Sequence, residues 1–142
     1  MTAGARYDHS VSAGNVEIVR QAVQAAIDGD WKRAVSDLDT AVELDQPRPT
    51  GIYYGRSGVQ EAMERWSEAW SERRVELEEL IDAGEQVVVI THEYATSVRT
   101  GVTLDRSIAE VWTLRAGRVV AIDGYSDRDT ALAAAGAPPG SA

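Results

Sequence analysis

The spacing of the apolar residues changes near residue 73, and this change limits what the chain can fold into. Before it, apolar residues recur every three to four positions, as on one face of a helix. After it, they alternate with polar residues, as in strands with one buried face. Glycines that favour tight turns stand at Gly84, Gly101 and Gly117. We therefore predict four long strands, at residues 73–82, 86–99, 102–114 and 118–126.

The first half of the chain predicts three helices and one short strand. Asn15 and Asp30 are good helix N-cap residues, and Ser57 with Gln60 forms a capping box. Helices are expected at residues 15–28, at 30–38 and from 57 through Trp70, and the short strand at 40–45. A proline-containing loop is expected at 46–51 and a last helix at 127–135.

Helices that come before an antiparallel sheet indicate an α+β fold. We predict a cone-shaped, curved antiparallel sheet of four long strands plus one short strand, wrapped around three N-terminal helices, with a short C-terminal helix. The cone domain is expected at residues 15–135. The small and polar residues of 1–14 and 136–142 predict disordered tails.

Charge and composition exclude several classes of partner and cofactor. The net charge of −9 argues against nucleic acid and anionic membrane surfaces. The absence of cysteine excludes disulfides, thiolate metal sites and a cysteine nucleophile. Nucleotide-binding glycine motifs and a nucleophile elbow are also missing, and no residue spacing favours a metal, so we expect no cofactor. The longest aliphatic run, Val87–Ile90, is too short to span a bilayer, and the N-terminus lacks an apolar signal core, so we expect a cytoplasmic protein.

Glu110 is the unusual residue of the long strands. It shares a strand face with Ile108, Trp112 and Leu114, so it is expected to point into the cone. Desolvation there would raise its pKa and leave a carboxylic acid that can donate a proton. The alternative is an ion pair at the sheet surface with Arg106 or with an arginine of another strand.

Two further carboxylates are candidate acid–base groups. Glu93 is expected to line the cone, and Asp45 is a candidate base at its mouth, although a solvated strand end explains Asp45 equally well. Several carboxylates without an evident cation suggest shared protons or a cationic, amine-bearing ligand. Aromatic residues that are expected to line the cone or its entrance, or to pack in the core, are Trp112, Trp66, Trp70, Tyr53, Tyr54 and Trp31.

Four phrases of the sequence resemble the nuclear transport factor 2-like superfamily, and within it the SnoaL-like polyketide cyclase and ketosteroid isomerase branch: NVEIVRQAVQAAIDGDW, YYGRSGVQEAMERW, EELIDAGEQVVV and EVWTLRAGRVVAIDGYSDRDTAL. The resemblance covers residues 15–135. It implies a ligand site inside the cone and a homodimer through the outer face of the sheet, where Val88, Ile90 and Tyr94 are expected. That face is alternatively a surface for another protein.

The resemblance matches the functional positions of the family only in part. In ketosteroid isomerase a Tyr of the first helix and a protonated Asp of the third long strand form the oxyanion hole; the matching residues here are Ala22 and Glu110. The family's base follows the short first strand, where Asp45 lies. The Asp-Arg-Asp set of limonene-epoxide-hydrolase-like members matches Glu93, Ala95 and Gly124. Epoxide hydrolysis is therefore not expected.

Two functions follow from these residues. The first is a cofactor-free acid–base enzyme of isomerase or cyclase type, acting on a small apolar carbonyl-bearing molecule in the cone. Glu110 would be the acid, Asp45 the base and Glu93 a secondary acid–base group. The second, favoured by the missing family residues, is a non-catalytic small-molecule-binding or dimeric accessory protein of the same fold.

Overall fold

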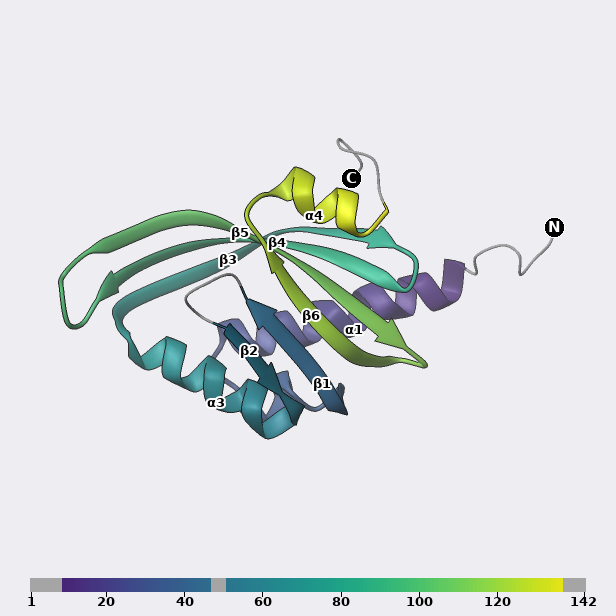
Figure 1. The fold of residues 1–142 in the computed structure, drawn as a ribbon, viewed down its shortest axis with the longest axis horizontal. Helices are drawn as coiled ribbons and strands as arrows, with labels where there is room; N and C mark the ends of the chain where they lie inside the picture. Colours follow the sequence, from purple (N-terminus) through teal and green to yellow (C-terminus); the bar gives the residue numbers. More distant parts are fainter. Residues whose placement is uncertain (1–8, 47–50, 137–142) are drawn as a thin grey trace.

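The computed structural model describes residues 9–46 and 51–136, which form one six-stranded sheet and four helices (Figure 1). The helices are α1 (His9–Ile27), α2 (Trp31–Ala34), α3 (Gly55–Glu68) and α4 (Arg128–Ala134). The strands are β1 (Leu38–Gln46), β2 (Gly51–Tyr54), β3 (Trp70–Ala83), β4 (Gln86–Ser97), β5 (Thr103–Arg115) and β6 (Arg118–Tyr125). The α+β cone predicted from the sequence is confirmed.

The sheet differs from the prediction in two respects. Its order is β2-β1-β6-β5-β4-β3, and β1 pairs with β6 in parallel, whereas the other neighbours are antiparallel. The sixth strand, β2, was not predicted, because four residues between a proline-containing loop and a helix carry little periodic signal. The β5–β6 turn has positive φ at Ala116 (52°) and Gly117 (77°), as the favoured hairpin turn requires.

Helix ends show where tertiary contacts replace local capping. Helix α1 begins at His9, so the residues just before Asn15 are helical and not a tail. The Asn15 side chain is instead buried and donates through Nδ2 to the carbonyl of Gly84 (3.2 Å). The predicted capping box at Ser57 is also wrong, because α3 starts at Gly55 without a side-chain cap. Residues 1–8, 47–50 and 137–142 lie outside the described part of the chain, so the predicted tail ends and proline loop fall there.

The sheet has a core on each face. The inner core joins alternate residues of the long strands, such as Val87, Val89 and Trp112, to α1 and β1. The outer core joins the intervening residues, such as Val88 and Ile90, to helix α4. The period-two alternation therefore buries both sides of β4. The predicted outer face is partly covered by the chain's own last helix, which lies across it in Figure 1.

Within the described residues, no helix combines the length and the apolar composition needed to cross a membrane.

Candidate functional site

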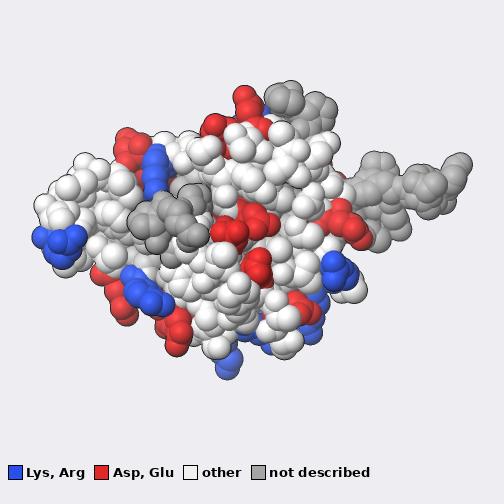
Figure 2. All heavy atoms as spheres, viewed as in Figure 1, with Lys and Arg blue, Asp and Glu red and all other residues white. Residues whose placement is uncertain are grey.

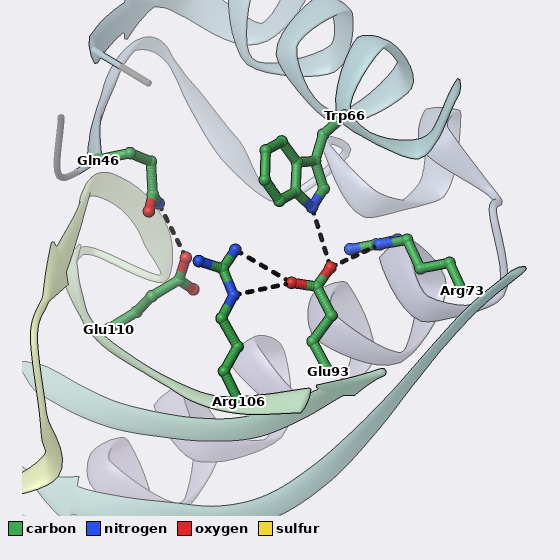
Figure 3. A network of polar contacts seen from close by, with 6 residues as sticks. All are labelled: Gln46, Trp66, Arg73, Glu93, Arg106 and Glu110. Carbon is green, nitrogen blue, oxygen red and sulfur yellow. Dashed lines mark hydrogen bonds and ion pairs between the residues drawn. The ribbon is translucent and has the colours of Figure 1, made fainter. Parts of the chain in front are cut away.

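A polar network crosses the inner face of the sheet, where the pattern of the strands otherwise places apolar side chains (Figure 3). It draws residues from β1, α3, β3, β4 and β5: Gln46, Trp66, Arg73, Glu93, Arg106 and Glu110. Strand register explains how the members meet. Arg106 stands directly opposite Glu93 across the β4–β5 ladder, and Glu110 lies four residues further along β5 on the same face.

Glu93 is the centre of the charged half of this network. Its side chain is fully buried, with 0% exposed. Its Oε2 accepts from Trp66 Nε1 (3.0 Å) and Arg73 Nε (2.8 Å), and its Oε1 accepts from Arg106 Nε and Nη2 (both 3.1 Å). Burial raises the pKa of Glu93, but the hydrogen bonds from Arg73 and Trp66 and the charges of both arginines outweigh burial and bring the pKa below its ordinary value. Glu93 is therefore held ionised.

This arrangement corrects two expectations from the sequence. The sequence indicated no cation near the carboxylates of the cone, but Arg73 and Arg106 both form ion pairs with Glu93. Arg106 also pairs with Glu93, and not with Glu110 as the surface alternative required. The sequence singled out Arg106 only as a partner for Glu110, because the register across two strands was not available from one strand alone.

Glu110 is the centre of the other half of the network. Its Oε1 accepts from Trp112 Nε1 (2.9 Å), and its Oε2 accepts from Gln46 Nε2 (2.9 Å). Burial raises the pKa of Glu110 and outweighs the lowering effect of these two hydrogen bonds. Among the described residues, no ion pair involves Glu110. The residue as a whole is partly exposed, and the pKa of its carboxyl group is shifted toward the protonated form.

Asp45 lies on the opposite face of the sheet from Glu110. Its neighbour Leu44 packs in the inner core, so Asp45 and Glu43 point outward, and Asp45 stands beside Asp123 in the β1–β6 register. Figure 2 shows acidic side chains gathered over β1 and β6. Burial raises the pKa of Asp123, and the charges of Asp45 and Glu43 raise it further. The structure thus does not bring Asp45 and Glu110 together; Gln46, the next residue, is the one that reaches Glu110.

The predicted aromatic residues divide into two groups. Trp112 is buried beside Glu110, and Trp66 contacts Trp70 edge to face, with ring centroids 5.3 Å apart. These three lie at the network, and Trp70 starts β3 where the sequence had predicted the end of a helix. Trp70 Nε1 is buried and has no hydrogen-bond partner among the described residues.

The other aromatic residues lie away from the network. Tyr53 packs against the inner core at the edge strand β2. Tyr54 is 65% exposed, and Trp31 starts the short helix α2.

Two of the hollows on the described surface lie away from Glu110 and Glu93. One, of about 710 Å³, is open and lies at the far ends of β3, β4 and β5, lined by residues that include Arg74, Tyr94 and Asp105. The other, of about 230 Å³, lies beside the start of α4. No group of three or more metal-ligating side chains is assembled within residues 9–46 and 51–136.

Similarity to solved structures agrees with this architecture. A nuclear transport factor 2-like protein from Burkholderia thailandensis has 25% identity and a TM-score of 0.74, over 87% of this chain and 98% of that one. TerC, co-crystallised with polyporic acid, has 24% identity and a TM-score of 0.71, over 80% of this chain and 92% of its own. A ketosteroid isomerase-like protein from Catenulispora acidiphila, in complex with trimethylamine, has 15% identity and a TM-score of 0.68, over 86% and 94%.

The family comparison covers most of the described chain. No curated protein matches the sequence. The SnoaL-like domain matches residues 19–122, which run from the middle of α1 into β6 and include every member of the inner network. This chain belongs to the SnoaL-like domain family of the nuclear transport factor 2-like superfamily.

Proposed function

We propose that this protein binds a small carbonyl-bearing molecule inside the cone and acts on it by acid–base chemistry, with Glu110 as the proton donor. One observation carries the proposal: Glu110 is a desolvated carboxyl group on the inner face, bound by two N–H donors, with a raised pKa and without an ion pair among the described residues. In its protonated form such a group can donate to a carbonyl oxygen and stabilise the negative charge that develops there.

The neighbours of Glu110 have positioning roles in this proposal. Trp112 fixes one carboxyl oxygen from the same strand, and Gln46 fixes the other from β1. Isomerisation and cyclisation of carbonyl compounds both pass through an enol or enolate, so one oriented acid serves either reaction. Small molecules bound to TerC and to the Catenulispora protein support a ligand-binding use of the same fold.

A specific observation also favours a second function, non-catalytic binding of a small molecule. Enolisation needs a base as well as an acid. Glu93 is ion-paired on both oxygens, and Asp45 lies on the other face of the sheet. Glu110 is thus the carboxyl group of the network without an ion pair, and it would act alone.

Exchange of α-protons for deuterium distinguishes these functions. Tetralone and related enolisable ketones are incubated with the protein in deuterated buffer, and the loss of the α-proton signal is followed by NMR. We expect wild-type protein to accelerate exchange and Glu110→Gln to lose about a hundredfold or more of that rate. Asp45→Asn is the matched control and should retain it. If the wild type binds the ketone without accelerating exchange, non-catalytic binding replaces catalysis as the function.

We also propose that two copies associate through the part of the outer sheet face that α4 leaves uncovered. This surface is ordered by contacts among its own side chains: the Tyr94 ring lies 4.5 Å from the His92 ring and 4.4 Å from the Arg74 guanidinium carbon. Light scattering should give a dimer mass for the wild type and a monomer mass for Tyr94→Asp. A monomeric wild type would exclude this interface.

A further inference from the structure

Resting on the proposed function, we infer that the ligand of the cone is an organic anion, an ionised enol, phenol or carboxylic acid, whose charged oxygen is bound by Arg106 and Arg73 beside Trp70. The proposal names the chemical class of the ligand and a second binding point, separate from Glu110. It rests on unused hydrogen-bond donors, on a buried indole without an acceptor, and on the charge of the network.

The two arginines keep donors that the protein does not use. A guanidinium group has five N–H bonds. Arg106 contacts Glu93 with Nε and Nη2, and Arg73 contacts it with Nε alone. Their remaining Nη–H bonds have no acceptor within the described part of the chain. Because the side chains are 46% and 23% exposed, these donors are within reach of a ligand, whereas Glu93 is not.

Trp70 supplies an independent observation. Its indole Nε1 is buried and has no hydrogen-bond partner among the described residues. Buried N–H groups in folded proteins nearly always have an acceptor, so this one needs an explanation. Trp66 joins it to the arginines, because the Trp66 ring contacts Trp70 and lies 5.4 Å from the guanidinium carbon of Arg106. An oxygen of a ligand bound in this neighbourhood would supply the missing acceptor.

The charge balance of the network differs from that of the whole molecule. The chain carries −9, yet the network sets two arginines against two glutamates, and burial raises the pKa of one of these glutamates, Glu110. The outward carboxylates at Asp45 and Asp123 lie across the sheet. An anion at the remaining guanidinium N–H groups therefore gains favourable electrostatics that a neutral molecule does not. The cationic ligand suggested by the sequence came from counting carboxylates without their arginines.

The spacing of the two binding points suits a ring-sized ligand. Arg106 and Glu110 are four residues apart on one strand face, about 13 Å between Cα atoms at the usual strand rise. The Arg106 side chain extends toward Glu110 and shortens this gap, as Figure 3 shows. A planar hydroxycarbonyl compound can therefore place its anionic oxygen at the arginines and its carbonyl oxygen at Glu110.

Isothermal titration with a matched pair of compounds tests the inference. Lawsone is an acidic hydroxynaphthoquinone that is ionised at neutral pH, and its methyl ether is neutral and of nearly the same shape. We expect wild-type protein to bind lawsone at least about tenfold more tightly than the ether, as for a charge-assisted hydrogen bond. Arg106→Gln should remove most of this preference. Arg115→Gln, which removes the same charge from an exposed site at the other end of β5, should keep it.

The remaining variants and outcomes separate this inference from the proposed function. Trp70→Phe removes the unpartnered N–H together with part of the ring, so it should weaken the binding of lawsone more than that of the ether; it also serves if Arg106→Gln does not fold. Equal binding of the two compounds by the wild type overturns the anion inference but leaves the Glu110 site standing. An equal loss of the preference for lawsone in Arg106→Gln and Arg115→Gln also overturns the anion inference. Binding of neither compound overturns the anion inference and the small-molecule site together.

Discussion

Glu93 and Glu110 are the same kind of residue on the same face of the same sheet, yet the structure drives their pKa values in opposite directions. Both are desolvated, and both accept a hydrogen bond from a tryptophan. Glu93 also faces Arg73 and Arg106, whereas the other neighbour of Glu110 is the uncharged Gln46. The cation, and not burial alone, decides whether a carboxyl group of this cone is charged.

This difference assigns different work to the two ends of the network. An ionised carboxylate that already accepts four hydrogen bonds has little capacity left for a substrate, but it orders two arginines and one indole. Glu110, whose pKa is raised, is the more readily protonated of the two. The Glu93 end therefore organises donors, and in the proposed function the Glu110 end would supply the acid.

The largest effect is expected at the charged end. Glu93→Gln leaves Arg73 and Arg106 without their buried counter-charge, so we expect the free energy of unfolding to fall by about 3 kcal/mol, measured in urea. Glu79→Gln breaks the bidentate pair with Arg128, whose side chains are about one-third exposed, and should cost much less. Equal losses in the two variants would mean that burial of Glu93 adds nothing to its ion pairs.

The pH dependence of stability should separate the two carboxyl groups by sign. Glu93 has a folded pKa below its ordinary 4.5, so its stabilisation is present above that value and is lost as the pH falls through the folded pKa. Glu110 has a raised folded pKa, so its contribution is complete below 4.5 and is lost as the pH rises through the folded pKa.

Thermal melts between pH 3 and pH 9 measure this directly. We expect Glu110→Gln to cost about 1 kcal/mol at acidic pH, through one imperfect hydrogen bond, and to approach or exceed wild-type stability at alkaline pH. Asp45→Asn, on the opposite face, should not reproduce this crossing. Parallel curves for wild type and Glu110→Gln would show that Glu110 is not held neutral.

The smallest effect is expected at Gln46. Gln46→Met removes the donor to Glu110 Oε2 with little change of shape, so the pKa of Glu110 should rise further and stability should fall by about 0.5–1 kcal/mol at neutral pH. Gln86→Met removes a donor to the hydroxyl of Thr113 and is the control. A pH profile that moves equally in both variants would contradict a specific role for Gln46.

Much of the fold was predictable because the local spacing of apolar residues indicates which segments are helices and which are strands. The four long strands follow from alternating apolar residues between glycines. The predicted cap at Asp30 is confirmed by a bond from the backbone N–H group of Arg33, and Asp127 caps the last helix in the same way through Thr130. The prediction was wrong where a side chain contacts a residue that is distant in the sequence. Asn15 was predicted as a cap, although its side chain is used to hold the β3–β4 turn.

The candidate site was predictable in part, because the alternation of side chains along a strand predicts which residues of that strand share a face. Parity by itself placed Glu110 on one strand face with Trp112, and the β4–β5 register then brought Glu93 to the same inner face. Parity within β1 also separates Asp45 from Leu44, but which of the two faces inward depended on the parallel pairing with β6.

Only the tertiary structure decided the charges. The sequence determined which side chains of one strand share a face, because a strand sends alternate side chains to one face. It did not determine their protonation, because a pKa depends on what lies within a few ångströms across neighbouring strands. Arg73 and Arg106 come to Glu93 from β3 and β5, and Gln46 comes to Glu110 from β1, through registers that form only when the sheet is assembled.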